Sequence, residues 1–225
     1  MTAIERIADA YPSWWVDLMG EHNHVGGAEA TRWLLDHARI RRGARMLDCG
    51  AFLGAAARAA AATGVLAYAS DVNHDFVAAA RTLDHGEQVI PVVAATQRLP
   101  FRDGTFASVW SLDAPLAPRE MSRVARGGAT LCLCTEVPTD SRGGHEAFLD
   151  EWAAYGWYLT AHRAMSMEAL QLWRRCEAEL VAHRPRFEAR YGKRGYLAQL
   201  DLLGGFVRGY ERGDQGHALF VFARD

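Results

Sequence analysis

The feature that most constrains the fold is a short apolar stretch that runs into a glycine turn and an alanine-rich segment. Residues 46–54 read Met-Leu-Asp-Cys-Gly-Ala-Phe-Leu-Gly, and residues 55–62 are alanine except for Arg58. Apolar residues before a turn are typical of a buried strand, and alanine is the strongest helix former. The stretch therefore predicts a strand, a tight turn and a helix.

The predicted turn has the chemistry of a nucleotide site. Gly50 and Gly54 lack Cβ, so the backbone can turn sharply and approach a ligand, while the helix beyond presents unpaired N–H groups. Residues 65–70 predict a second strand, and Asp71 follows it. A carboxylate at that place can accept hydrogen bonds from both hydroxyls of a ribose.

This pattern resembles the first two motifs of the class I S-adenosylmethionine (SAM) dependent methyltransferases. The residues that carry the resemblance are Asp48, Gly50, Phe52, Gly54 and Asp71. It implies SAM as the cofactor, with Asp48 beneath its amino-acid end and Asp71 on its ribose. Phe52 stands where the family usually has glycine, although the catechol-type O-methyltransferases also carry an aromatic residue there. An apolar structural turn is the alternative.

The preceding segment extends the resemblance to the phosphoethanolamine and sarcosine type methyltransferases. Gly20-Glu21 and the Gly-Gly-Ala-Glu-Ala-Thr of residues 26–31 resemble segments that form part of the lid over SAM in those enzymes. The loop between them contains His22 and His24, which suggests general-base or metal chemistry. No third ligand is apparent, so no metal is predicted and His24 is kept as a catalytic candidate.

The rest of the chain alternates between strand-like and helix-like segments. The pattern predicts an α/β fold: a Rossmann-like, seven-stranded, mostly parallel sheet with helices on both faces, the class I methyltransferase fold. The expected strands are 45–48, 65–71, 88–93, 107–112, 129–135, 157–163 and 217–223. The expected helices are 4–18, interrupted near Tyr11-Pro12, then 28–38, 54–63, 74–83, 117–125, 144–155, 166–187 and 194–211.

This reading divides the chain into two parts. Residues 1–43 are expected to form an N-terminal helical lid. Residues 44–225 are expected to form the SAM-binding Rossmann-like domain, with a helical insertion at about 166–211. Ser166 is expected to cap the first helix of that insertion, and residues 138–144 form the most open loop.

Ligands of open α/β sheets bind beyond the carboxyl ends of the strands. We therefore expect the catalytic residues to be Asp113, Glu136 and His24. The expected cofactor-binding residues are Asp48, Gly50, Ala51, Phe52, Gly54, Asp71, Val72, Asn73, Ala95, Thr96 and Asp113.

Three positions depart from the relatives that the chain resembles. Ala95 replaces an Asp that touches the adenine amino group, a loss of about 1 kcal/mol of binding free energy. Ala117 replaces a catalytic His of the phosphoethanolamine enzymes, and Ile7 falls where they carry a Tyr. The phosphobase reaction is therefore not predicted, although Asp113 matches.

Other side chains suggest a different acceptor. Glu136 follows the fifth predicted strand, where a carboxylate can hold an amine or accept a proton; a loop salt bridge is the alternative. Methyl transfer from a sulfonium needs little acid–base help once the nucleophile is aligned. An aromatic wall for a cation or a flat apolar molecule is suggested by Trp14, Trp15, Trp110, Trp157 and Tyr158, although Trp110 also suits the core.

Composition limits which partners and which cellular compartment are expected for the protein. The chain of 225 residues has 25 Lys and Arg against 27 Asp and Glu, so no nucleic-acid partner is expected. The four cysteines lack CxxC spacing, which argues against a disulfide frame or a zinc site. With no signal pattern or spanning segment apparent, we expect a cytoplasmic protein with a small-molecule substrate and no membrane partner, and a homodimer stays open.

The leading hypothesis is a SAM-dependent methyltransferase that acts on a small-molecule, specialised-metabolite acceptor. One alternative is an enzyme of the same fold that does not methylate, and that cyclises SAM or rearranges another substrate. Phe52, Ala95 and Ala117 motivate that alternative. The other is a non-catalytic subunit that has kept the fold.

Overall fold

The computed structural model describes residues 13–83, 88–138 and 145–224. Most of the helix expected at 4–18, and with it Ile7, lies outside the described residues, and so does most of the loop expected at 138–144. The helices before the insertion are α2 (Trp14–Met19), α3 (Gly27–Ala38), α4 (Ala55–Ala61), α5 (His74–Thr82), α6 (Pro118–Val124) and α7 (Glu146–Ala153).

The described part of the chain forms one seven-stranded sheet in the order β3-β2-β1-β4-β5-β7-β6. Neighbouring strands from β3 to β5 pair in parallel, and β7 lies antiparallel between β5 and β6. The predicted fold class is therefore confirmed. The strands are β1 (Arg45–Cys49), β2 (Leu66–Asp71), β3 (Val89–Val93), β4 (Phe106–Leu112), β5 (Ala125–Pro138), β6 (Trp157–Ala164) and β7 (Gln215–Arg224).

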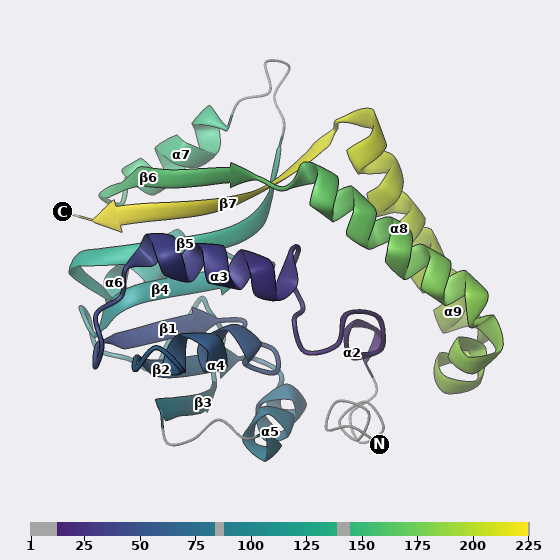
Figure 1. The fold of residues 1–225 in the computed structure, drawn as a ribbon, viewed down its shortest axis with the longest axis horizontal. Helices are drawn as coiled ribbons and strands as arrows, with labels where there is room; N and C mark the ends of the chain where they lie inside the picture. Colours follow the sequence, from purple (N-terminus) through teal and green to yellow (C-terminus); the bar gives the residue numbers. More distant parts are fainter. Residues whose placement is uncertain (1–12, 84–87, 139–144, 225) are drawn as a thin grey trace.

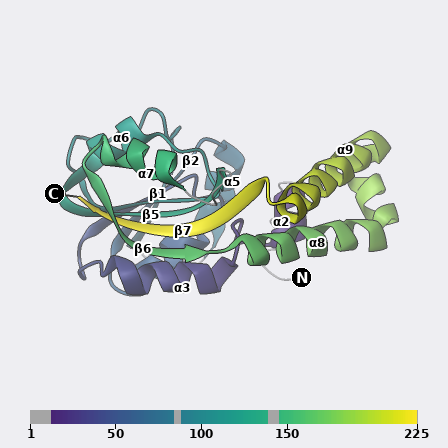
Figure 2. The same ribbon diagram turned by 90° about the horizontal axis from the view of Figure 1, so that it is seen from above.

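Helices cover both faces of the sheet. Figure 2 shows α3 on one face, and α6 and α7 on the other. Successive side chains of a strand point to opposite faces, so Trp110 of β4 joins the core with Leu34 of α3, whereas Val109 joins the other core with Phe220. Trp110 is fully buried, which confirms the core reading of this residue.

Beyond the sheet, α8 (Ser166–Ala182) and α9 (Arg184–Arg212) pack along each other and project past the carboxyl edge of the parallel strands, next to α2 (Figure 1). The break between the predicted helices comes at His183, earlier than expected. Pro185 explains this, because proline disrupts a helix interior but suits the first turn of a new helix. The backbone leaves helical geometry again at Gly192, where φ is 76°.

The predicted cap of α8 is wrong. Ser166 is the first residue inside the helix, Met165 holds the cap position, and no side chain caps it. The Ser166 hydroxyl instead accepts a hydrogen bond from the His217 N–H at 3.1 Å. This contact ties the start of α8 to β7.

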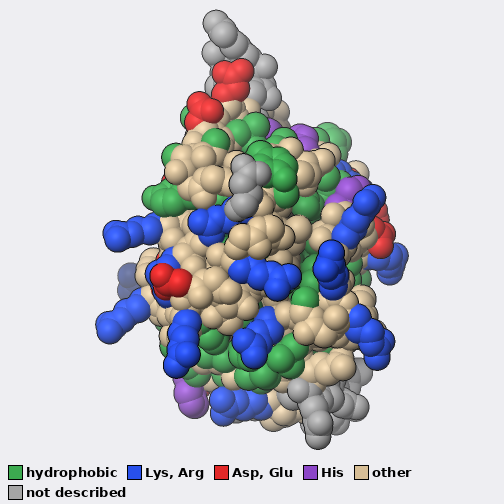
Figure 3. All heavy atoms as spheres, turned by 90° about the vertical axis from the view of Figure 1, so that its left-hand side faces the viewer, with side chains coloured by type: hydrophobic (Ala, Val, Ile, Leu, Met, Phe, Trp, Pro, Cys, Tyr) green, Lys and Arg blue, Asp and Glu red, His purple; other side chains and the backbone are tan. Residues whose placement is uncertain are grey.

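The surface is uneven in charge. The end of the molecule away from α8 and α9 shows many Lys and Arg side chains and few Asp and Glu side chains (Figure 3). The formal net charge of the chain is −2, so this is a local asymmetry. None of the described helices is long and apolar enough to cross a membrane.

Phe187 offers a test of whether α2, α8 and α9 form part of the main core. Its ring is fully buried and stacks on Trp14 at 5.8 Å between ring centroids. We expect Phe187→Ala to lower the free energy of unfolding by about 3–5 kcal/mol. Urea denaturation measures this change. The control Leu197→Ala removes a side chain that is 48% exposed and is expected to stay within about 0.5 kcal/mol of wild type. Equal effects of the two changes would contradict a shared core.

Candidate functional site

The glycine turn after β1 is built as the sequence predicts. Gly50 has φ of 70°, a left-handed conformation that favours glycine. A Cβ on Gly50 would lie 2.3 Å from the Cβ of Ala114, so the turn also needs glycine for close approach. Ala51 donates its N–H to the Ser70 carbonyl at 2.8 Å, and Gly54 precedes the first residue of α4. The turn is thereby fixed between β2 and the segment after β4.

Phe52 adopts the left-handed conformation that glycine would favour, with φ of 51°. A non-glycine residue pays conformational free energy in this backbone conformation, and two contacts offset it. The Phe52 N–H donates to Asp71 Oδ2 at 2.9 Å, and its ring packs edge-on against Phe76 at 4.5 Å between centroids. These contacts hold an aromatic residue in a backbone conformation that favours glycine.

Asp71 lies at the end of β2 and holds the backbone around it. Its Oδ1 accepts the Asn73 N–H at 2.8 Å, and Asn73 in turn caps α5 by accepting the Asp75 N–H. Burial raises the pKa of Asp71, and hydrogen bonds from backbone N–H groups partly offset that effect. Each carboxylate oxygen keeps a second lone pair for a ligand hydroxyl. Val72 beside it is 71% exposed, an apolar surface open to a ligand.

Asp48 is buried beneath the turn. Burial raises its pKa to about 7, and the charge of Asp71 adds to this rise. It lines a small cavity of about 20 Å³ whose other described residues are Glu21, Asn23, His24, Gly50, Ala51, Phe52, Ala55, Ala56 and Leu112. A buried carboxylate with a raised pKa favours a cationic ligand in this cavity.

The remaining expected cofactor residues follow β3 and β4. Thr96 is buried, and Ala95 forms an isolated bridge with Arg98 in the loop after β3. Asp113 follows β4 with φ of 51°, and its N–H donates to the Cys134 carbonyl at 2.7 Å. The expected residues therefore line the carboxyl ends of four adjacent strands.

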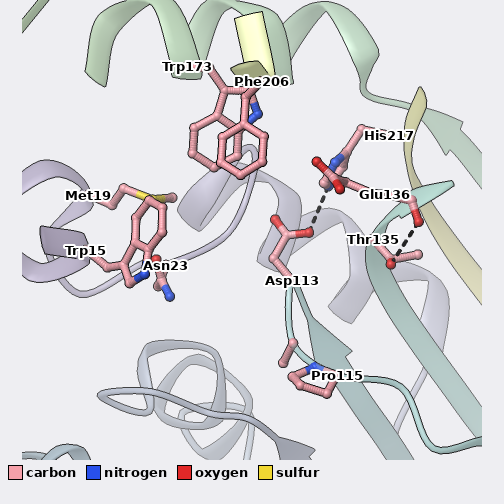
Figure 4. Close-up of a pocket in the computed structure, with 11 residues that line it drawn as sticks. Trp15, Met19, Asn23, Asp113, Pro115, Thr135, Glu136, Trp173, Phe206 and His217 are labelled. Atoms are coloured by element: carbon pink, nitrogen blue, oxygen red, sulfur yellow. Dashed lines mark hydrogen bonds and ion pairs between the residues drawn. The ribbon is translucent and has the colours of Figure 1, made fainter. Parts of the chain in front are cut away.

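A larger cavity of about 350 Å³ opens beyond Asp113 (Figure 4). One wall is aromatic and apolar and comes from α2, α8 and α9, whereas the other carries carboxylates from the ends of β4 and β5. Among the described residues that line it, none is Lys or Arg. They are Trp15, Met19, Asn23, Asp113, Ala114, Pro115, Thr135, Glu136, Trp173, Phe206 and His217.

A chain of hydrogen-bonding side chains lies along the polar wall. His217 Nε2 lies 3.0 Å from Asp113 Oδ1, and His217 Nδ1 lies 2.9 Å from the Tyr210 hydroxyl. The same hydroxyl lies 3.2 Å from Glu136 Oε1. Asp113 Oδ2 accepts the Val25 N–H at 2.8 Å. Two of the three catalytic candidates, Asp113 and Glu136, are therefore linked through two residues that sequence reasoning missed.

His24, the third candidate, does not line the cavity of about 350 Å³; it lines a separate cavity of about 590 Å³ beside α8. Its Nε2 lies 2.9 Å from the Gly27 carbonyl and 3.1 Å from the Thr31 hydroxyl. Burial lowers the pKa of His24 to about 4. Its position beside Asp48 is that of a neutral residue that holds the loop before α3.

The expected aromatic wall is only partly correct. Trp15 lines the cavity, but Trp14 stacks on Tyr191 at 3.7 Å. Trp157 is buried with its Nε1–H donated to Ser122, and Tyr158 is exposed on β6. The wall comes instead from Trp173 and Phe206 with Trp15 and Met19.

Strand pairing is the signal that could have pointed to His217. Once β7 is placed antiparallel to β5 in the observed register, His217 lies opposite Glu136.

One cluster has the donor set of a metal site. Ligand atoms of Asp113, Cys134 and His217 all lie within 4.8 Å of one another. The same atoms are already engaged in hydrogen bonds, and burial together with the charge of Asp113 raises the pKa of the Cys134 thiol well above its ordinary value. In this structure the three side chains therefore form a hydrogen-bonded cluster.

Comparison with known proteins finds a matching domain and matching folds. Residues 47–133, from β1 to β5, match the model described as a methyltransferase domain. No curated protein matches the chain. Solved structures do match, but their sequence identities to this chain are low, so the likeness shows the fold alone.

Three solved structures illustrate the likeness. A sarcosine dimethylglycine methyltransferase structure from Galdieria sulphuraria is 15% identical with a TM-score of 0.85, over 99% of this chain and 98% of that chain. The [4+2]-cyclase SpnF is 22% identical with a TM-score of 0.71, over 86% of this chain and 79% of that one. The third is phosphoethanolamine N-methyltransferase 2 of Haemonchus contortus in complex with SAM. It is 14% identical with a TM-score of 0.76, and the match covers all of this chain but 60% of that one.

The matched segment holds the glycine turn, and the phosphoethanolamine N-methyltransferase of the same fold was solved with SAM bound. Residues 47–133 therefore match a methyltransferase domain, and the described part of the chain has the class I methyltransferase fold.

Proposed function

We propose that this enzyme transfers the methyl group of SAM to a small amine with an apolar or aromatic body. The larger cavity, called the acceptor cavity from here on, carries the proposal. Its carboxylates, Asp113 and Glu136, face an aromatic wall of Trp15, Trp173 and Phe206 (Figure 4). Carboxylates pair with an ammonium group, and aromatic faces attract a cation.

The charge of the acceptor cavity disfavours an anionic acceptor. A phosphate or carboxylate on the acceptor would require Arg or Lys as a partner, and none of the described lining residues is either. It would also be repelled by Asp113 and Glu136. The acceptor therefore differs from phosphoethanolamine, which carries a phosphate. A specialised metabolite with a basic nitrogen fits the volume of about 350 Å³.

The cofactor is proposed to lie across the carboxyl ends of β1 to β4. Asp48 would hold the α-ammonium group in the small cavity, Asp71 would hold the ribose, and Val72 and Thr96 would contact the adenine. Asn23 lines both cavities, so it would lie between cofactor and acceptor. Residues 1–43 are proposed to act as the lid, and the insertion at 166–211 to close the acceptor cavity.

The reaction requires these residues to deprotonate the acceptor and to align it with SAM. The attacking nitrogen must be neutral, so the acceptor ammonium gives a proton to a carboxylate of the cavity. The nitrogen lone pair then attacks the methyl carbon, and the C–S bond breaks with its electron pair left on sulfur. Alignment of the two ligands supplies most of the acceleration.

A non-methylating reaction is the second candidate, because the [4+2]-cyclase SpnF has the same fold. This alternative predicts that SAM keeps its methyl group and that the acceptor gains no mass. The purified enzyme is incubated with SAM and a panel of amines, alcohols, phosphorylated acceptors and polyenes, and the products are identified by mass spectrometry. We expect S-adenosylhomocysteine and an amine heavier by one methylene. Rearranged acceptor with intact SAM would favour the cyclase-type alternative.

Trp173 tests the acceptor cavity. Trp173→Ala removes aromatic surface from the wall, and we expect the KM for the amine to rise about tenfold or more while the Kd for SAM stays unchanged. Steady-state kinetics and calorimetry measure the two quantities. Trp33→Ala is the matched control, because Trp33 stacks on His37 on α3 and lines neither cavity. A KM that rises equally in both variants would contradict this acceptor site.

Asp48 gives SAM binding a pH dependence. Its pKa of about 7 in the free protein means that acid protonates the carboxyl that should pair with the ammonium group. We expect SAM affinity to fall about tenfold from pH 8 to pH 6, as for one group that must lose its proton. Calorimetry at several pH values checks this.

Asp48→Asn should bind SAM weakly and without that pH dependence. Its stability provides the folding control. A raised carboxyl pKa makes the wild type lose stability as pH rises from about 4 through about 7. The Asn variant lacks this loss and should be at least as stable as wild type at pH 8. A variant that melts much earlier at pH 8 would contradict the assignment of Asp48.

A further inference from the structure

The hydrogen bonds along the polar wall of the acceptor cavity form a continuous path. It runs from Glu136 Oε1 to the Tyr210 hydroxyl at 3.2 Å, then to His217 Nδ1 at 2.9 Å, and from His217 Nε2 to Asp113 Oδ1 at 3.0 Å. Four elements contribute: β4 and β5 end at the carboxylates, β7 carries the imidazole, and α9 carries the phenol. We call these four residues the relay.

Counting protons shows that the relay has two arrangements. The Tyr210 hydroxyl has one proton but two acceptor neighbours, His217 Nδ1 and Glu136. When His217 is neutral, its Nε2–H donates to Asp113 and Tyr210 donates to Nδ1, so Glu136 receives no bond from Tyr210. When His217 is an imidazolium, Nδ1–H donates to Tyr210 and Tyr210 donates to Glu136. One added proton converts the first arrangement to the second without displacing a heavy atom.

We propose that the relay removes and stores the proton that the acceptor amine releases. This proposal rests on the proposed function. Glu136, which is exposed to the cavity, takes the proton from the ammonium. It passes a proton to the Tyr210 oxygen while the Tyr210 proton moves to His217 Nδ1. Glu136 is then ionised again, and Asp113 stabilises the imidazolium through Nε2–H.

The surroundings of each relay member suit this role. The His217 side chain is 1% exposed and that of Asp113 is 19% exposed, so the stored charge is shielded from water but lies beside a carboxylate. Burial, and then the charge of Glu136, raises the pKa of Tyr210 far above its ordinary range. Tyr210 therefore conducts a proton as a hydroxyl and is not itself the base.

Other groups around His217 are compatible with a stored positive charge. The titratable groups that face it are Asp113 from the end of β4, Cys134 and Glu136 from β5, Tyr210 from α9, and His24 from the loop before α3. Cys134 is a neutral thiol because burial raises its pKa, and His24 is neutral because burial lowers its pKa to about 4. The carboxylates therefore decide the local charge.

Tyr210→Phe cuts the relay and leaves both carboxylates and His217 in place. We expect kcat for the amine to fall about tenfold or more near pH 7, with KM and the Kd for SAM unchanged. The loss should shrink as pH rises, because solution then supplies the neutral amine. Tyr191→Phe is the control, since Tyr191 also lies on α9 but its hydroxyl donates to Asp17 at 2.5 Å, outside the cavity. A loss that is the same at every pH would overturn the relay while leaving the methyltransferase proposal intact.

A second measurement needs no acceptor. Nitrogen NMR of labelled histidine follows protonation of His217 with pH, with His217→Asn to assign the signals. We expect the titration midpoint to fall in Tyr210→Phe, because the imidazolium loses the acceptor of its Nδ1–H and charge-assisted bonds are the stronger ones. If the midpoint falls but no amine is methylated, the hydrogen-bonded path from His217 to Tyr210 stands, and the proposed function fails together with the role of the path in amine deprotonation.

Two outcomes of that measurement would overturn the relay. One is a midpoint that is the same in wild type and Tyr210→Phe. The other is stoichiometric Zn²⁺ binding that disappears in both His217→Asn and Cys134→Ser, which would mark a metal centre in place of a proton store.

Discussion

The carboxylate of Asp113 is the interaction on which the site depends. One oxygen accepts the Val25 N–H from the loop before α3, and the other lies against His217 of β7. Its own N–H is bonded to the carbonyl of Cys134 in β5. A single residue in a left-handed conformation thus joins the N-terminal segment to three strands. Removing it would leave the Val25 N–H without its partner and His217 Nε2 without its carboxylate, and each loss costs free energy.

The same arrangement sets the electrostatics of the two cavities. Asp48 and Asp71 lie on the proposed cofactor side, and Asp113 and Glu136 on the acceptor side. No described residue that lines the acceptor cavity is Lys or Arg, and Arg58 on α4 is paired with Glu21. SAM carries positive charge on its sulfonium and its ammonium group, and an amine carries one more. The negative charge of these side chains would lower the cost of bringing two cations together, and that cost would fall further once the proposed amine acceptor gives up its proton.

The fold was predictable from sequence because it depends on local signals. The glycine turn at Gly50, the alanine-rich helix and the apolar strands each carry their pattern within a few residues, and the seven strands fall close to where the pattern predicts them. The acceptor cavity was less predictable. Trp173, Phe206 and Tyr210 sit on amphipathic helices, where an aromatic residue that packs and one that lines a cavity give the same periodicity. Only the path of α8 and α9 past the sheet edge decides between them.

His217 shows why part of the site could not be predicted from the sequence. It is one of nine histidines, and its neighbours in sequence are those of an ordinary strand. Its chemistry arises because β7 runs antiparallel between β5 and β6, which puts His217 opposite Glu136. A parallel β7 would place a different residue there. The orientation of one strand thus brings an imidazole between two carboxylates, and the hydroxyl of Tyr210 completes the connection from α9, a helix of the insertion between β6 and β7.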